Sequence, residues 1–78
     1  MQKIMIIEDD PAIREELALL LENEGYASLV ITEFTDVPGQ AARECPDLIL
    51  LDIGLPGKDG FSLCAALRRA VPAPVIFV

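Results

Sequence analysis

Four short apolar runs, each separated from the next by a segment of helical character, constrain this fold more than any other feature of the sequence. The runs are Lys3–Ile7, Ala27–Ile31, Leu48–Leu51 and Pro74–Val78. The third is continuously apolar, and so is the fourth from residue 75 onward. Continuous runs are typical of strands that are buried on both faces of a parallel sheet. The alternation therefore predicts an α/β fold, with a parallel sheet, right-handed crossovers and helices on both faces.

Helical segments are expected between the runs, and the first of them has clear start and stop signals. The expected ranges are Pro11–Glu24, about Val37–Glu44 and about Gly60–Ala70. Asp10 suits the N-cap of the first helix, because its carboxylate can accept a hydrogen bond from a free backbone N–H. Gly25 suits the position that ends this helix. The simplest interpretation of Asp10 is therefore a structural one.

Apolar side chains recur at helical spacing in the first and third segments. They are Ile13, Leu17, Leu20 and Leu21 in the first segment, and Phe61, Cys64 and Leu67 in the third. Such a stripe predicts the side of the helix that packs against the sheet. The two cysteines, Cys45 and Cys64, are expected to be reduced apolar fillers, because they form no CxxC pair and the chain has no histidine. Reduced cysteines indicate a cytoplasmic protein.

The charge balance and the missing histidine exclude several classes of function. The chain has 13 Asp and Glu residues against 6 Lys and Arg, a formal net charge of −7. This balance argues against direct binding to nucleic acid or to an anionic membrane, because both need basic side chains. The absence of histidine excludes Ser-His-Asp and Cys-His catalysis and argues against a zinc site. The first apolar run is too short for a signal peptide or a membrane span.

Acidic residues follow the first and the third apolar run directly. Glu8 and Asp9 come after the first run, and Asp52 comes after the third. Ligand sites of open parallel sheets lie at the carboxyl ends of the strands, so these three acids meet if the two strands are neighbours. Their mutual repulsion would raise their pKa values, and a divalent cation would remove that cost. An all-oxygen ligand set points to Mg²⁺.

The segment that follows Asp52 adds to this hypothesis. Gly54 could let a backbone carbonyl approach an ion closely, and an aspartate beside Mg²⁺ is a plausible nucleophile for phosphoryl transfer. Each feature taken alone also has a simpler interpretation. Glu8 and Asp9 fit a solvated loop, Asp52 and the glycine-rich segment after it fit a turn, and Lys58 and Asp59 fit solvated loop charges. The combination on two strand ends favours the ion site.

Three segments together resemble the receiver domain of two-component response regulators. They are Ile6–Pro11, Asp47–Gly60 and Pro74–Val78, and the resemblance covers the whole chain. It implies a flavodoxin-like, three-layer α/β/α fold, in which the family sheet has five parallel strands in the order 2-1-3-4-5. This chain would supply the part in the order 2-1-3-4 and would lack the last α-β-α elements.

The resemblance also implies a role for each acidic residue of the cluster. Asp52 matches the phosphoacceptor, which takes a phosphoryl group from a sensor histidine kinase. Asp9 matches the acid that binds Mg²⁺ directly, with Asp52 and the carbonyl of Gly54 as further ligands. Glu8 matches the acid that holds the ion through water. The segments are most similar to those of regulators with a winged-helix DNA-binding domain, which implies a transcriptional regulator and not an enzyme.

Three functional positions of the family lie beyond Val78, namely a Thr or Ser, a Lys and an aromatic residue. Residues 1–78 are therefore expected to be the amino-terminal fragment of a receiver domain. The alternative is a phosphorylation-impaired module that dimerises through an exposed sheet edge or an uncovered face. An independent phosphohydrolase with an aspartyl nucleophile is disfavoured, because such enzymes need a second acid where this chain has Gly54.

Overall fold

The computed structural model describes residues 1–54 and 59–78 and contains the expected order of strands and helices. The elements are β1 (Lys3–Ile7), α1 (Pro11–Asn23), β2 (Ala27–Val30), α2 (Val37–Glu44), β3 (Leu48–Leu51), α3 (Gly60–Ala70) and β4 (Val75–Phe77). The predicted ranges agree with these bounds to within one residue at each end. In the two described stretches, none of the helices combines the length and the apolarity needed to cross a bilayer.

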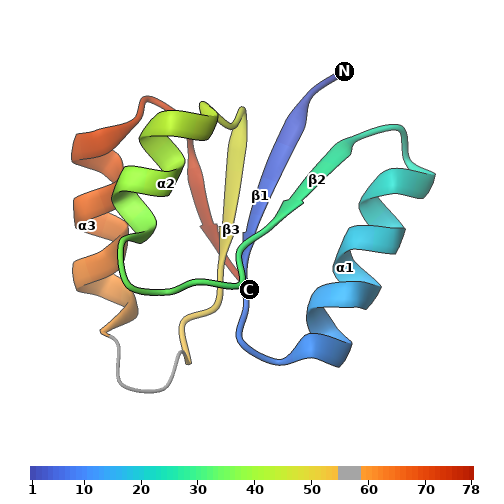
Figure 1. Cartoon of the computed structure of the whole chain (residues 1–78), viewed down its shortest axis with the longest axis horizontal. Helices are drawn as coiled ribbons and strands as arrows, with labels where there is room; N and C mark the ends of the chain where they lie inside the picture. The colour runs from blue at the N-terminus through green and yellow to red at the C-terminus, as the bar shows by residue number, and fades with distance from the viewer. Residues whose placement is uncertain (55–58) are drawn as a thin grey trace.

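The described strands form one parallel sheet in the order β2-β1-β3-β4, which confirms the predicted order. Ile4 of β1 is paired with Ser28 of β2 on one side and with Leu48 of β3 on the other. Figure 1 shows α1 on one face of the sheet, and α2 and α3 together on the other. The fold is therefore the three-layer α/β/α arrangement that the resemblance implies.

The main core lies between the sheet and the α2–α3 pair. Its strand residues include Met5, Ile7, Ile49 and Leu51, and its helix residues include Val37, Ala41, Cys64 and Leu67. The strand residues are two apart because successive side chains of a strand point to opposite faces. Burial of each large apolar side chain contributes roughly 1.5–3 kcal/mol to the free energy of folding. The predicted inward positions of Cys64 and Leu67 are confirmed.

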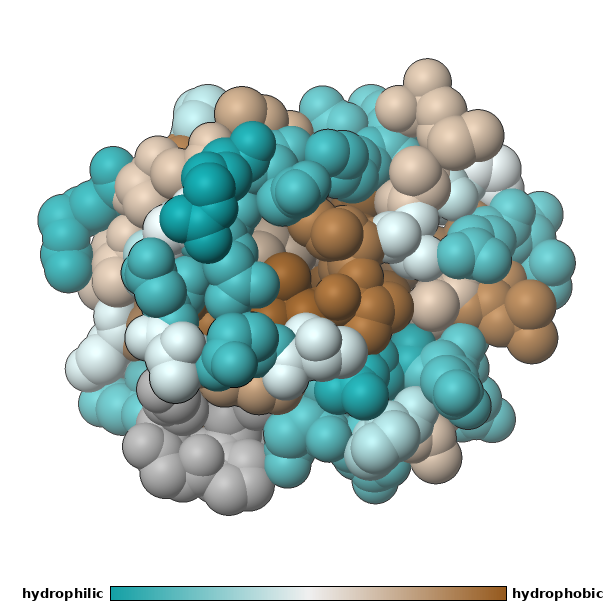
Figure 2. Space-filling view, in the orientation of Figure 1, coloured by the Kyte–Doolittle hydropathy of each residue, from teal (hydrophilic) through white to brown (hydrophobic). Residues whose placement is uncertain are grey.

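The other face of the sheet is only partly covered, by α1. No residue of α1 is buried, and Ile13, Leu19 and Leu20 are exposed by 45%, 61% and 60%. The prediction that Ile13 and Leu20 are buried with the rest of their stripe was wrong. The reason is that α1 packs chiefly on β1 and β2, so that the side of the helix facing away from them meets little of the sheet. Figure 2 shows apolar surface between the helices on the face in view.

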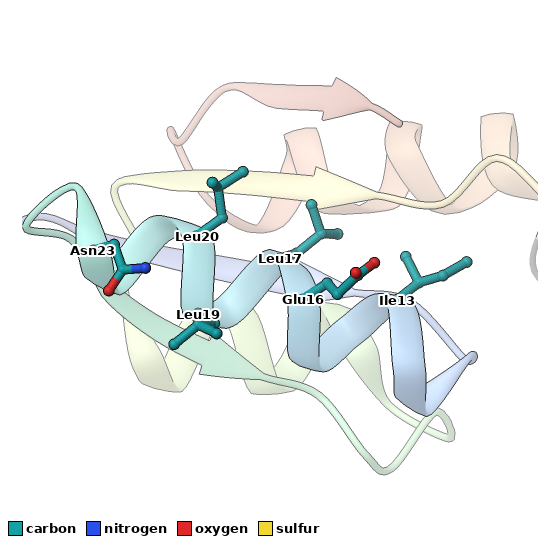
Figure 3. Close-up of a pocket in the computed structure, with 6 residues that line it drawn as sticks. All are labelled: Ile13, Glu16, Leu17, Leu19, Leu20 and Asn23. Carbon is teal, nitrogen blue, oxygen red and sulfur yellow. The ribbon is translucent and has the colours of Figure 1, made fainter.

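An open cavity of about 400 Å³ lies along the uncovered side of α1. It is lined by Ile13, Glu16, Leu17, Leu19, Leu20 and Asn23, and Figure 3 shows these side chains. All six come from the same helix, so the cavity is a shallow surface feature.

Phe61 and Cys45 also depart from the predictions. Phe61 was expected to face inward but is 65% exposed, because it lies in the first turn of α3, where its ring contacts the ring of Phe77 at a centroid distance of 5.3 Å. Cys45 was expected to fill a gap in the core but is exposed. It ends α2 in a left-handed conformation with φ of 50°, and its Sγ donates to the carbonyl of Ala42.

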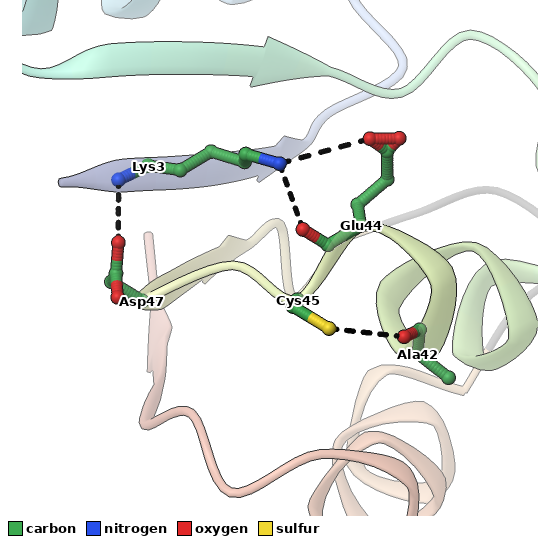
Figure 4. Close-up of polar contacts among 5 residues, drawn as sticks. All are labelled: Lys3, Ala42, Glu44, Cys45 and Asp47. Atoms are coloured by element: carbon green, nitrogen blue, oxygen red, sulfur yellow. Dashed lines mark hydrogen bonds and ion pairs between the residues drawn. The ribbon is translucent and has the colours of Figure 1, made fainter. Parts of the chain in front are cut away.

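The amino-terminal end of the sheet is held by polar contacts of Lys3, which Figure 4 shows. Its backbone N–H donates to Asp47 Oδ2 at 2.7 Å, and its Nζ donates to the carbonyl of Glu44 at 2.8 Å. Nζ also forms an exposed ion pair with the Glu44 carboxylate at 3.8 Å, which adds little stability because solvent screens it. These contacts connect the segment between α2 and β3 to β1.

Candidate metal and phosphoacceptor site

The candidate site lies at the carboxyl ends of β1 and β3, which are neighbours in the sheet. Ile7 and Leu51 are paired at the last positions of the two strands, and the N–H of Asp52 donates to the carbonyl of Ile7 at 2.9 Å. Glu8 and Asp52 therefore follow their strands at the same level. The carboxylates of Glu8, Asp9 and Asp52 each offer an oxygen, and these oxygens lie within 4.8 Å of one another.

Glu8 is the buried member of the cluster. Its side chain is only 5% exposed, and its Oε1 accepts a hydrogen bond from the N–H of Asp10 at 3.2 Å. Burial raises the pKa of Glu8, and so do the contact with the Asp52 carboxyl and the negative charges of Asp52 and Asp9, whereas the Asp10 N–H acts in the opposite direction. The repulsion predicted from the sequence thus contributes to the raised pKa of Glu8, but burial is the larger cause of that shift.

Asp52 is half-buried, and its Oδ1 accepts a hydrogen bond from the N–H of Gly54 at 2.9 Å. The residue therefore begins a turn, as its simpler interpretation expected, and it also lies beside Glu8 and Asp9, while its role at an ion site stays a prediction. The described contact of Gly54 is made by its N–H, and the role of its carbonyl as a metal ligand stays a prediction.

Two other aspartates of the region act as helix caps. Asp10 Oδ1 accepts from the N–H of Ala12 at 2.9 Å, which confirms its predicted role as the N-cap of α1. Asp59 was expected to be a solvated charge, but it is the N-cap of α3 and accepts from the N–H of Phe61 and from Ser62 Oγ, each at 3.0 Å. These bonds lower the pKa of Asp59. Its position directly before the predicted helix was the signal that could have identified Asp59 as an N-cap.

The remainder of the predicted glycine-rich segment, residues 55–58 with Gly57 and Lys58, lies outside the described residues. Arg14, for which the sequence predicted no role, lies against the site. Its Nη1 donates to the backbone carbonyl of Glu8 at 3.3 Å. The sequence carries no signal for this contact, because spacing does not specify the direction of a long side chain.

The arrangement has the chemistry of a site for a hard divalent cation. Three carboxylates supply oxygen ligands, and Mg²⁺ is bound in proteins through one or two carboxylates together with water and substrate phosphates. The pKa of Glu8 is raised chiefly by burial and further by the negative charges of Asp52 and Asp9, which a bound cation would offset. The residues present therefore fit Mg²⁺.

Two comparisons of sequence identify relatives of this chain. Residues 4–78 match the family model of the response regulator receiver domain. The chain is 45% identical to the transcriptional regulatory protein YxdJ of Bacillus subtilis, over 100% of this chain and 34% of that protein. It is 34% identical to the DNA-binding response regulator MtrA of Mycolicibacterium smegmatis, over 99% of this chain and 34% of that protein. The chain thus spans about a third of the length of these relatives.

Solved structures give the same result for the fold. The N-terminal domain of the nisin resistance regulator NsrR, a lantibiotic response regulator, has a TM-score of 0.88 and 39% identity, over 99% of this chain and 65% of that one. The BeF3-activated receiver domain of Klebsiella pneumoniae RstA has a TM-score of 0.86 and 39% identity, over 97% of this chain and 65% of that one. Since the family match extends from residue 4 to residue 78, the chain belongs to the response regulator receiver domain family.

Proposed function

We propose that Asp52 accepts a phosphoryl group from a sensor histidine kinase in a step that depends on Mg²⁺. The observation that carries this proposal is the cluster of Glu8, Asp9 and Asp52, whose oxygens lie within 4.8 Å of one another. In the proposed step a carboxylate oxygen of Asp52 bonds to phosphorus while the P–N bond of the donor's phosphohistidine breaks. The product is an aspartyl phosphate, and the released imidazole takes a proton from solvent.

Each residue of the cluster has a distinct proposed role. Asp9, Asp52 and the carbonyl of Gly54 are the direct ligands of Mg²⁺, and Glu8 holds the ion through water. The ion supplies positive charge that neutralises the oxygens of the incoming phosphoryl group. The half-buried Asp52 remains open to that group, whereas Glu8 is enclosed and has a raised pKa, which suits a supporting role.

We further propose that residues 1–78 are the amino-terminal part of a receiver domain in a DNA-binding transcriptional regulator of the cytoplasm. Support comes from the relatives, which are named as transcriptional or DNA-binding regulators. The segment itself would act as a signalling domain and not as an enzyme. Its net charge of −7 is unfavourable for direct contact with DNA, so DNA binding would belong to other parts of such a protein.

A second candidate function is association with another copy of this chain. The observation that favours it is the exposed apolar surface, which includes Ile13 and Leu20 on α1 and Ile76 on β4. Light scattering at increasing concentration tests this candidate. The expected result is a dimer that Leu20→Lys converts to a monomer, and a wild-type monomer at every concentration would contradict it.

Phosphorylation with a small-molecule donor tests the main proposal. The protein is incubated with acetyl phosphate and Mg²⁺, and intact mass and peptide mapping show whether one phosphoryl group is added to Asp52. Asp52→Asn is expected to abolish the addition, and so is chelation of Mg²⁺. Asp36→Asn is the matched control, because Asp36 caps α2, is not one of the clustered carboxylates, and asparagine is also a good N-cap. Undiminished labelling of the Asp52→Asn protein would refute the assignment.

A further inference from the structure

We propose that Arg14 is a positioning residue for the Mg²⁺ site, because its guanidinium fixes the backbone of Glu8 and thereby the carboxylates of the loop between β1 and α1. This inference rests on the proposed function, since it assumes that the acidic cluster binds Mg²⁺. It adds a residue of α1 that does not itself touch the ion.

The first support is the way in which Glu8 is held. Its backbone carbonyl accepts from Arg14 Nη1 at 3.3 Å, and its carboxylate accepts from the N–H of Asp10 at 3.2 Å. The side chain and the backbone of Glu8 are thus fixed by separate donors. Asp9 lies between Glu8 and Asp10, so its position depends on the same two bonds.

The second support is the balance of charge around the loop. Two carboxylates of this loop face the carboxylate of Asp52, and repulsion among the three favours any movement that separates them. A hydrogen bond from a charged donor to a backbone carbonyl is stronger than one from a neutral donor. Arg14 is therefore suited to hold the loop against this repulsion before an ion arrives.

The third support is the placement of the other basic side chains in the described part of the chain. Lys3 is bonded at the opposite end of the sheet, to Glu44 and Asp47. Arg43, Arg68 and Arg69 lie in the last turns of α2 and α3. Helices that cross between parallel strands run back along the sheet, so these last turns lie far from the carboxyl ends of the strands. Of the described basic residues, Arg14 is the one that is bonded to the acidic loop.

When the charge of Arg14 is removed, a positioning role and simple electrostatics predict opposite changes in the affinity for Mg²⁺. A fixed positive charge repels Mg²⁺, so its removal alone would tighten binding. Loss of the bond to Glu8 would instead leave the ligands less ordered and weaken binding. Groups that orient metal ligands typically contribute roughly 10–100-fold to affinity. We expect an effect at the lower end of this range, about tenfold, because Arg14 contacts the backbone of one ligand only.

The test is a calorimetric titration of the protein with MgCl₂. Arg14→Met keeps an unbranched side chain but removes the charge and the donor, and it is expected to weaken Mg²⁺ binding about tenfold. Arg14→Lys keeps a charged donor and is expected to recover part of the loss. Arg43→Met is the matched control in α2 and is expected to leave the affinity unchanged. Thermal unfolding without Mg²⁺ establishes that each variant is folded, and Arg14→Leu replaces Arg14→Met if the latter is not.

The outcomes separate this inference from the proposed function. Equal or tighter binding by Arg14→Met would overturn the inference while leaving the Mg²⁺ site intact. A lower unfolding temperature with unchanged affinity would also overturn it, because Arg14 would then be merely structural. An Arg14→Lys protein that binds as weakly as Arg14→Met would contradict a role through donation to the Glu8 carbonyl. A wild-type protein that binds no Mg²⁺ would instead overturn the proposed function, and the inference with it.

Discussion

Ile7 of β1 and Leu51 of β3 lie opposite each other at the last positions of two neighbouring parallel strands. The register of this pair decides where the acids meet. A shift of one residue would turn the side chains of one strand to the other face and would separate Glu8 from Asp52. The hydrogen bond from the N–H of Asp52 to the carbonyl of Ile7 continues the pairing by one step beyond the strand. The meeting of Glu8 and Asp52 at this edge of the sheet therefore depends on the register of β1 and β3.

Replacement of Glu8 by glutamine is expected to stabilise the protein in the absence of divalent cations. The buried carboxylate has a raised pKa, so its charge opposes folding at neutral pH, and glutamine removes that charge at nearly the same size. We expect the free energy of unfolding to rise by about 1 kcal/mol. Urea titration with EDTA present measures it.

Addition of Mg²⁺ is expected to reverse this order. A ligand that binds only the folded state stabilises it more when it binds more tightly, and the wild type should bind the ion more tightly than Glu8→Gln. Glu16→Gln, on the exposed surface of α1, is the control and should behave as the wild type. A Glu8→Gln protein that is less stable than the wild type in EDTA would count against the repulsion described here.

Gly60→Ala is expected to destabilise the protein, although alanine is the better helix former. A Cβ at this position would lie 3.1 Å from the carbonyl oxygen of Ile53 and 3.2 Å from its Cα. Backbone atoms cannot move aside as a flexible side chain can, so we expect a loss of about 1–2 kcal/mol of unfolding free energy. Chemical denaturation measures this loss.

Gly54→Ala is the matched control for Gly60→Ala. The nearest atom to a Cβ at Gly54 is Asp52 Oδ1, at an ordinary contact distance of 3.5 Å. The control should therefore lose less stability than Gly60→Ala. Equal losses in both variants would show that the Ile53 backbone is not the obstacle.

The cap of α3 is expected to weaken in acid. The pKa of Asp59 is lowered in the folded state, so the stability that its charge contributes is present above the unfolded value of 3.8 and is lost as pH falls through the folded value. Thermal unfolding from neutral pH to acid should show the wild type approaching Asp59→Ala at the acidic end. Asp59→Asn should keep a cap that does not change with pH. A constant difference between the wild type and Asp59→Ala would argue that the charge has no role.

Truncation of apolar side chains should distinguish the two faces of the sheet. Leu67 of α3 is fully buried, and Leu67→Ala is expected to lower the unfolding free energy by roughly 2–5 kcal/mol. Leu20 of α1 is exposed, and Leu20→Ala is expected to change it by no more than about 0.5 kcal/mol. Denaturant unfolding of the two variants provides the comparison, and similar losses would contradict an uncovered α1 surface.

The sequence predicted the strands, the helices and the meeting of Glu8, Asp9 and Asp52, because these follow from local patterns and from the geometry of parallel sheets. It failed where burial depends on what covers a surface. Spacing shows that Ile13 and Leu20 share a side of α1, but it does not show whether the sheet extends beneath them.

The cap formed by Asp59 and the contact of Arg14 were missed for different reasons. Asp59 was judged by its charge, whereas its function as a cap follows from the start of α3 directly after it. The contact of Arg14 with Glu8 joins two elements through a long side chain, and no pattern of spacing specifies the direction of such a side chain.

If Asp52 is phosphorylated as proposed, the contacts of Lys3 with Glu44 and Asp47 have a mechanical consequence. They lock β1 to the entry of β3 at the end of the sheet remote from Asp52, so the two central strands resist sliding past each other. A change of charge at Asp52 would then act on a sheet whose two central strands stay in place. Any displacement that transmits the change would have to arise in the surrounding loops and helices and not in the sheet itself.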